Sequence, residues 1–176
     1  MKTRDCIAIR QESGKIQSTD FKHGTIEDVK TFDLGKGESF DMLKVRGDDN
    51  GKRAFEFLAK NTGVEWSHAM MGIKGERGLN FLTSTHSLGH EAGMSHLIKY
   101  QLQFGYTARI FNHSHPSGNS TPSGLHDGTG DVYFASQVNR IFNKSLDYNI
   151  YIPLYNGFCS LYRNYLPIDQ YKNYVP

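Results

Sequence analysis

Several features that would mark a protein class at once are scarce in this chain of 176 residues. There are two cysteines, Cys6 and Cys159, which lie near opposite ends and outside any CxxC pair. This excludes a disulfide framework, and we expect two free thiols that leave the redox compartment unassigned. No apolar run approaches the roughly 20 residues of a membrane span. The N-terminus lacks the apolar centre of a signal peptide, so we expect export to need another device or a longer carrier chain.

An excess of charge of one sign is also lacking. The chain has 20 lysines and arginines against 18 aspartates and glutamates, for a net charge of +2, and both signs are spread along it. The absence of a basic block argues against a nucleic-acid partner and against an anionic membrane surface. The length suits one domain with a core of its own and is too short for two domains of ordinary size.

The first 50 residues are polar and contain the turn signals DLGKGES and RGDDNGK. We predict a loosely organised N-terminal extension over residues 1–50, with one or two strands around residues 6–10 and 40–45. A single domain over residues 51–176 is predicted to follow it.

Helices and strands are expected to alternate after residue 50. Apolar spacing and glycine-rich stops predict helices over residues 53–62, 92–105 and 131–142. Strands are predicted as a hairpin of residues 64–72 and 78–87, a strand over 106–115, and a closing hairpin around the turn Asn156-Gly157. This order predicts an α+β (mixed α/β) domain in which helices flank a central mixed β-sheet.

The stretch FNHSHPSGNSTPSGLHDGTGD carries the candidate chemistry. Residues two apart on a strand point to the same side, so His113 and His115 can aim at one point beyond the sheet edge. Neutral imidazole is a good zinc ligand, but a catalytic zinc site takes three protein ligands and a water. The third ligand should come from the following loop or helix, where the candidates are His126, Asp127 and Asp131. The plainer interpretation is two strand histidines followed by a long turn.

The flanks of the histidine pair favour the metal site, because HSHPSGN is followed by PSG and by an aspartate at a predicted helix start. This compound pattern resembles the JAMM (JAB1/MPN/Mov34) metallopeptidases, whose signature is HxHP, a spacer, a proline–serine pair and an aspartate. The resemblance also implies a glutamate on an earlier strand with a glycine seven positions later, and Glu65 and Gly72 fit. It covers roughly residues 53–162 and implies a JAB/MPN-like (cytidine-deaminase-like) architecture.

One departure from the family pattern concerns the third ligand. The family aspartate lies three residues after the serine, but three residues after Ser123 stands His126. Asp127 would need a slightly longer loop, and Asp131 a loop lengthened by GLHDG. We predict Asp131, because the family aspartate begins a helix and the apolar periodicity here begins at Val132. Asp127 is followed by Gly-Thr-Gly, which is a poor helix start.

The resemblance implies a zinc-dependent peptidase or isopeptidase. His113, His115 and Asp131 would bind Zn²⁺ and leave one position for a water. Glu65 would be the general base, and the Ser123 hydroxyl would donate to the oxyanion. Taken singly, Asp131 could be only a helix cap, Glu65 only a surface carboxylate and Ser123 only a turn residue.

Within the family, the lengthened loop and the YIYIP…NG hairpin resemble the JAB-like domains at the C-terminal ends of bacterial polymorphic toxins. The segment FEFLAKNTGVEWS resembles the lead-in of those domains. This resemblance implies that residues 1–50 join the domain to a larger secreted or contact-delivered carrier. A protein or peptide substrate in a rival or host cell is then expected, with an immunity protein as a further partner.

Three other functions compete with the hydrolysis of peptide or isopeptide bonds. An inactive MPN-like protein-binding scaffold would purify without zinc. A zinc nucleobase deaminase needs HxE with PCxxC, and no cysteine lies near the histidine pair. A nuclease is disfavoured by the balanced charge. The other histidines of the core region, His68, His86, His90 and His96, are expected to be structural or exposed, although His90 and Glu91 could border a cleft.

Overall fold

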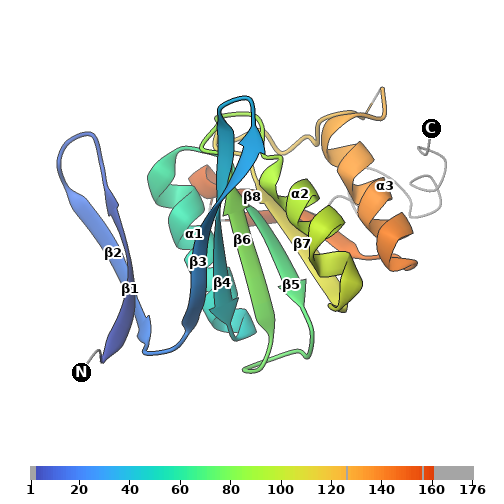
Figure 1. Ribbon diagram of the computed structural model, residues 1–176. Coiled ribbons are helices and arrows are strands. Elements are labelled where there is room, and N and C mark those ends of the chain that lie inside the picture. Colours follow the sequence, from blue (N-terminus) through green and yellow to red (C-terminus); the bar gives the residue numbers. More distant parts are fainter. Residues whose placement is uncertain (1–2, 126, 156, 161–176) are drawn as a thin grey trace.

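The computed structural model of the protein describes residues 3–125, 127–155 and 157–160 (Figure 1). Within these ranges lie nine strands, three α-helices and two short 3-10 helices. The strands are β1 (Arg4–Arg10), β2 (Ile16–Lys22), β3 (Ile26–Gly35), β4 (Glu38–Arg46), β5 (Ser67–Met71), β6 (Leu79–Ser84), β7 (Ala108–Ser114), β8 (Asp147–Ile152) and β9 (Gly157–Ser160). The helices are α1 (Asp48–Thr62), α2 (Gly93–Tyr100) and α3 (Gly130–Phe142), with 3-10 turns at Leu102–Phe104 and Pro153–Tyr155.

Seven strands form one mixed sheet in the order β3-β4-β6-β5-β7-β8-β9, and β1 and β2 form a separate two-stranded sheet. The pair β7 and β8 is parallel, and the other pairs of the large sheet are antiparallel. Parallel neighbours need a crossover, and α3 supplies it. The carboxyl end of β7 and the amino end of α3 therefore meet at the same edge of the sheet, which is where sheets of this kind place their sites.

The sheet separates two apolar cores. Helices α2 and α3 cover one face (Figure 1), and the core there includes Phe40, Leu97, Phe111 and Val138. Helix α1 covers the other face together with residues of β1 and β2, and its core includes Phe55, Leu82 and Tyr151. Each burial of such a side chain is worth roughly 1.5–3 kcal/mol, so both faces contribute to stability.

The predicted α+β class and the predicted order of elements after residue 50 are confirmed. Helix, hairpin, helix, strand, helix and hairpin follow one another as the apolar spacing indicated. Among the described residues no helix has the length and apolar character needed to cross a membrane. Cys6 is an exposed free thiol, and the side chain of Cys159 lies outside the described part.

The two strands predicted around residues 6–10 and 40–45 are confirmed as β1 and β4. The expectation of a loosely organised segment over residues 1–50 is wrong in its extent, since β2 and β3 lie there as well. Strands β3 and β4 belong to the large sheet, and Phe40 and Met42 of β4 are buried in the core. Strand β3 is an edge strand whose side chains are mostly exposed, so its sequence is polar and lacks a clear apolar alternation. The division of the chain at residue 50 remains a prediction, and the sheet contains strands from both sides of it.

Two element boundaries also differ from the prediction. Helix α1 begins at Asp48, because RGDDNGK supplies two acidic residues to its first turn instead of forming a turn. Gly51 inside this helix is buried, and a Cβ there would overlap the Asn80 side chain, so the glycine permits close packing. In the last hairpin, Gly157 pairs with Ile152 and the chain reverses through Pro153–Tyr155, so the two-residue turn is wrong; Asn156 lies outside the described residues.

Candidate metal centre

Two histidines lie at the carboxyl end of β7, an interior strand of the large sheet. His113 pairs with Ser67 of β5 on one side and with Ile150 of β8 on the other, so its backbone is held in the middle of the sheet. His115 follows the last residue of β7, and its backbone N–H donates to the carbonyl oxygen of Tyr151 at 2.9 Å. Both imidazoles are buried. They point to the same side of the sheet, as predicted for residues two apart on a strand.

Asp131 is delivered to the same end of β7 by the first turn of α3. Its Oδ2 atom accepts hydrogen bonds from the backbone N–H of Ser123 at 2.8 Å and from the Ser123 hydroxyl at 2.9 Å. The backbone N–H of Asp131 donates to the same hydroxyl oxygen at 2.9 Å. A Cβ on Gly130 would overlap Ser123 Oγ, and a Cβ on Gly124 would overlap the backbone of Thr129. The glycines therefore let the lengthened loop fold back on the start of the helix.

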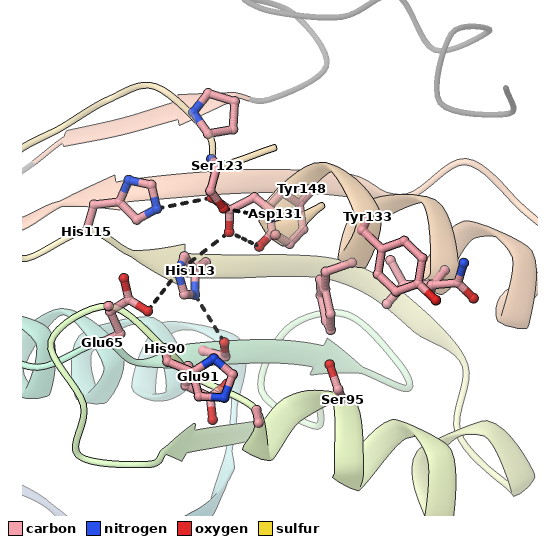
Figure 2. A pocket seen from close by; sticks show the side chains of 18 of the residues that line it. Glu65, His90, Glu91, Ser95, His113, His115, Ser123, Asp131, Tyr133 and Tyr148 are labelled. Atoms are coloured by element: carbon pink, nitrogen blue, oxygen red, sulfur yellow. Dashed lines mark hydrogen bonds and ion pairs between the residues drawn. The ribbon is translucent and has the colours of Figure 1, made fainter. Parts of the chain in front are cut away.

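The side chains of Glu65, His113, His115 and Asp131 converge on one point (Figure 2). His115 Nε2 lies 3.3 Å from Asp131 Oδ2, and His113 Nε2 lies 3.6 Å from Asp131 Oδ1. Glu65 Oε2 lies 3.5 Å from His113 Nε2 on the other side. One ligand atom each of Glu65, His113 and His115 lie within 4.8 Å of one another, so this buried group could hold a metal ion.

The outer atoms of both imidazoles are occupied in the way that metal-bound histidines require. His115 Nδ1 lies 2.8 Å from the carbonyl oxygen of Asn119, which can only accept, so Nδ1 carries a proton. His113 Nδ1 lies 3.3 Å from Ser67 Oγ. Such partners fix the ring orientation and leave Nε2 of each ring facing the centre. The donor set therefore fits a divalent ion that accepts nitrogen and oxygen ligands.

The charges at the site favour a cation at its centre. Burial raises the pKa of Asp131, but the hydrogen bond from His115, the charge of His113 and the N–H of Ser123 outweigh burial and hold that pKa well below its usual range. Burial lowers the pKa of His115, yet the hydrogen bond and charge of Asp131 raise it above its ordinary value. The carboxylate thus remains ionised beside the imidazole and attracts positive charge.

Glu65 and His113 are affected mainly by burial. Burial raises the pKa of Glu65 to about 7; the charge of His115 lowers it, and those of Asp131 and Glu91 raise it. Burial lowers the pKa of His113 to about 4 against the charge of Asp131, so this imidazole is neutral near pH 7 and presents a lone pair. A carboxyl group that titrates near pH 7 is suited to accept and return a proton.

The structure brings together Glu65, His113, His115, Ser123 and Asp131, the five residues singled out from the sequence. Asp127 lies in the loop, where its Oδ1 atom accepts hydrogen bonds from the N–H and hydroxyl of Thr129. His126, the other candidate ligand, lies outside the described residues.

Two further residues of the site were not predicted. Ser67 contacts His113, and the hydroxyl of Tyr148 donates to Asp131 Oδ1 at 3.3 Å. Ser67 stands two residues after Glu65, a spacing that could have indicated it. Tyr148 lies in an apolar strand and has no signal that separates it from a core residue. His90 and Glu91 do border the cavity, as the sequence allowed.

A cavity of about 870 Å³ contains the site and extends between α2 and α3. His68 is buried away from this cavity, and His86 pairs with Asp41 at 2.9 Å. Glu91 caps α2, since its carboxylate accepts the backbone N–H groups of Gly93 at 2.7 Å and Met94 at 3.3 Å. The site thus opens into a space much larger than one ion and a water require.

Comparison with known proteins gives one family. A family model described as JAB-like toxin 1 matches residues 43–136, which is just over half of the chain. The matched range includes all five residues that the sequence singled out. No curated protein and no solved structure matches the chain.

Proposed function

The chain belongs to the JAB-like toxin 1 family, and on that premise we propose that it is a zinc-dependent peptidase or isopeptidase that serves as a toxin domain. The predicted resemblance to JAB-like domains of bacterial toxins is confirmed by this membership. The hydrolytic activity, the metal and the roles of single residues belong to the proposal.

The observation that carries the proposal is the convergence of two imidazoles and two carboxylates at one end of a cavity. His113 lies between Glu65 and Asp131, at 3.5 and 3.6 Å from their oxygens, and His115 lies 3.3 Å from Asp131. In the proposed arrangement His113, His115 and Asp131 bind the ion, and Glu65 stays outside its coordination. When bound, Zn²⁺ would polarise the scissile carbonyl and lower the pKa of a water toward about 7.

Glu65 is assigned the proton transfers. Its carboxylate accepts a proton from the attacking water and later returns it to the leaving amine, for which its raised pKa is suitable. Ser123 is assigned the donor to the oxyanion. Because its hydroxyl proton is directed to Asp131 Oδ2, Ser123 would position that carboxylate first and would have to rotate to reach the substrate.

The family also supports proposals about partners. We assign a protein substrate in a rival or host cell and an immunity protein that blocks the toxin in the producing cell. The N-terminal residues before the matched range are assigned the junction to a larger carrier chain.

Metal analysis of the purified protein tests the proposal most directly. We expect close to one zinc per chain in the wild type and in Asp127→Ala, and a loss of at least tenfold in zinc affinity for His113→Ala and Asp131→Ala. Asp127→Ala is a matched control, because it removes a carboxylate from the same loop. Equal zinc in the wild type and in His113→Ala would end the metal-site hypothesis. Loss with Asp127→Ala but not with Asp131→Ala would move the third ligand.

Amide hydrolysis is tested separately, with a peptide library derived from a proteome and mass spectrometry of the products. New amino termini should appear with the zinc-loaded wild type and not with Glu65→Gln. A zinc-loaded wild type without any cleavage of peptides or isopeptides would instead favour a protein-binding scaffold.

A further inference from the structure

The cavity continues well beyond the candidate metal centre. Helices α2 and α3 form its two walls, and Ser95 of α2 lies across from Tyr133 of α3 (Figure 2). Its volume of about 870 Å³, which includes the candidate metal centre, is within the range of pockets that bind drug-sized ligands. The part between the helices lies beyond the candidate metal ligands and is not needed to bind an ion, so we consider what else could bind there.

The length of this part follows from the residues of α3 that line it. Asp131, Phe134, Val138 and Ile141 recur at spacings of three and four, so they form one stripe along the helix. At a rise of 1.5 Å per residue, the ten steps from Asp131 to Ile141 span about 15 Å. An extended chain advances roughly 3.3 Å per residue, so about four residues of a peptide fit between the metal centre and the far end.

The lining between the helices is apolar at its base and polar at its edges. Ile98 of α2 and Val138 of α3 are each 1% exposed and form the base. Phe134 is partly buried and Ile141 is 39% exposed, so apolar surface remains for an occupant to cover. At the edges, Ser95 and Gln137 provide groups that can hydrogen-bond to a peptide backbone.

The end near the metal centre has the opposite character. Glu65, Glu91 and Asp131 all line it, and Glu91 is already committed to the backbone N–H groups at the start of α2. These carboxyl groups and the two histidines make this end of the cavity polar, so it does not favour an apolar side chain beside the scissile bond. A large apolar side chain is accommodated only further along, beside Phe134 and Val138.

We propose that the cleft between α2 and α3 binds an extended peptide segment of the substrate and selects a large apolar side chain about three residues from the scissile bond. This inference rests on the proposed function, since it takes the metal centre as the place of cleavage. The substrate class is then an unfolded or flexible polypeptide segment, since about four extended residues match the length of the cleft.

Binding can be measured without metal or hydrolysis. The probes are the peptides acetyl-Ala-Ala-Leu-Leu-Ala-amide and acetyl-Ala-Ala-Ser-Ser-Ala-amide, titrated into the metal-free full-length chain. We expect the leucine peptide to shift the NMR methyl signals of Ile98, Val138 and Ile141 in a saturable way. Its dissociation constant should be at least tenfold lower than that of the serine peptide.

Three variants locate the binding. Ser95→Trp places an indole in the cleft and should abolish the response, whereas Ser145→Trp makes the same change at an exposed position outside the cleft and should leave it unchanged. Ile141→Ser removes exposed apolar surface and should weaken binding of the leucine peptide severalfold. Wild-type circular dichroism and zinc affinity in all three variants establish that the fold and the metal centre are intact.

Equal responses to the two peptides, or an unchanged response in Ser95→Trp, would overturn the inference. These outcomes leave the metal analysis and the hydrolysis assay untouched, so failure of the cleft and failure of the proposed function can be told apart. If cleavage is observed in the peptide library, the third residue from the cut should be enriched in leucine, isoleucine, phenylalanine and methionine on one side. A uniform distribution at both third positions would contradict the assignment.

Discussion

Asp131 makes more contacts than a residue at the start of a helix needs. One carboxylate oxygen accepts two hydrogen bonds from Ser123, and the other accepts the hydroxyl of Tyr148 at 3.3 Å. Both oxygens also face an imidazole. A carboxylate held from several directions keeps one orientation, and such outer partners commonly change metal affinity by about 10-fold to 100-fold.

Tyr148→Phe tests this residue network. The change removes one hydroxyl and keeps the ring, which packs against Phe134 with ring centroids 5.6 Å apart. We expect zinc affinity to fall by about tenfold, measured by competition with a chelator, because one restraint on Asp131 is lost. Tyr100→Phe, at an exposed position, is the control and should keep wild-type affinity. An affinity within twofold of the wild type for Tyr148→Phe would remove this tyrosine from the site.

At the scale of single residues, the sequence identified those whose chemistry is rare at a given spacing. Two histidines two residues apart, before a proline, are uncommon enough to be noticed, and the resemblance then directed attention to Glu65. Ser67 and Tyr148 were not predicted because serine and tyrosine are frequent in strands, and no nearby sequence pattern indicates that they contact His113 and Asp131. Their roles depend on the neighbours that β5 and β8 bring to them, which only the fold supplies.

The strands of the large sheet are also joined by a buried polar network whose residues do not line the cavity. Asn149 Nδ2 donates to Asn112 Oδ1, and Asn112 Nδ2 lies 3.0 Å from His68 Nδ1. His68 Nε2 lies 2.8 Å from Asn80 Oδ1, and Asn80 Nδ2 donates to the carbonyl of Gly47. These directions require a proton on Nε2 and a lone pair on Nδ1, so the network accepts only a neutral His68.

This network predicts a pH dependence of stability. Burial lowers the pKa of His68 to about 4, below the value of about 6.5 expected in the unfolded chain. Below about pH 6.5 the unfolded chain therefore binds more protons at His68 than the folded chain does. The contribution of neutral His68 to the unfolding free energy is complete above that pH and is lost as the pH falls toward 4. Between pH 7 and pH 5 the loss amounts to about 2 kcal/mol of unfolding free energy.

Urea unfolding of the metal-free chain at these two pH values measures the effect. His68→Gln cannot titrate, so its unfolding free energy should depend less on pH than that of the wild type by about 2 kcal/mol over this interval. The variant is expected to be less stable at pH 7, because its amide fits the asparagines less well. The same pH dependence in both proteins would show that His68 is not held in its neutral form.

Elements with strong periodicity could be predicted, and those determined by tertiary contacts could not. Helix α3 was recognised from the spacing of its apolar residues, and its start at Asp131 followed from the same pattern to within one residue. The start of α1 was missed because Gly51 is typical of a turn. A glycine is needed at this position of the helix because the backbone there packs closely against Asn80, 29 positions along the chain. Strand β3 was missed because an edge strand buries few side chains.

The whole molecule places the site at a junction of separate parts of the chain. Glu65 precedes β5, His113 and His115 lie at the end of β7 and just after it, and Asp131 lies in the first turn of α3. An ion bound there would connect these parts, so it should stabilise the folded chain as a whole. At a free zinc concentration 100 times the dissociation constant, this linkage is worth about 2.7 kcal/mol.

The same linkage separates the two possible roles of Glu65. This residue lies close enough to the histidines to be a ligand, whereas the proposal makes it the base and gives the third ligand position to Asp131. Added zinc should raise the melting temperature of the wild type and of Glu65→Gln by the same amount, because the amide removes a base and no metal bond. Asp131→Asn should lose most of that rise. Calorimetry at matched zinc concentrations checks this, and a rise that disappears in Glu65→Gln but survives in Asp131→Asn would exchange the two assignments.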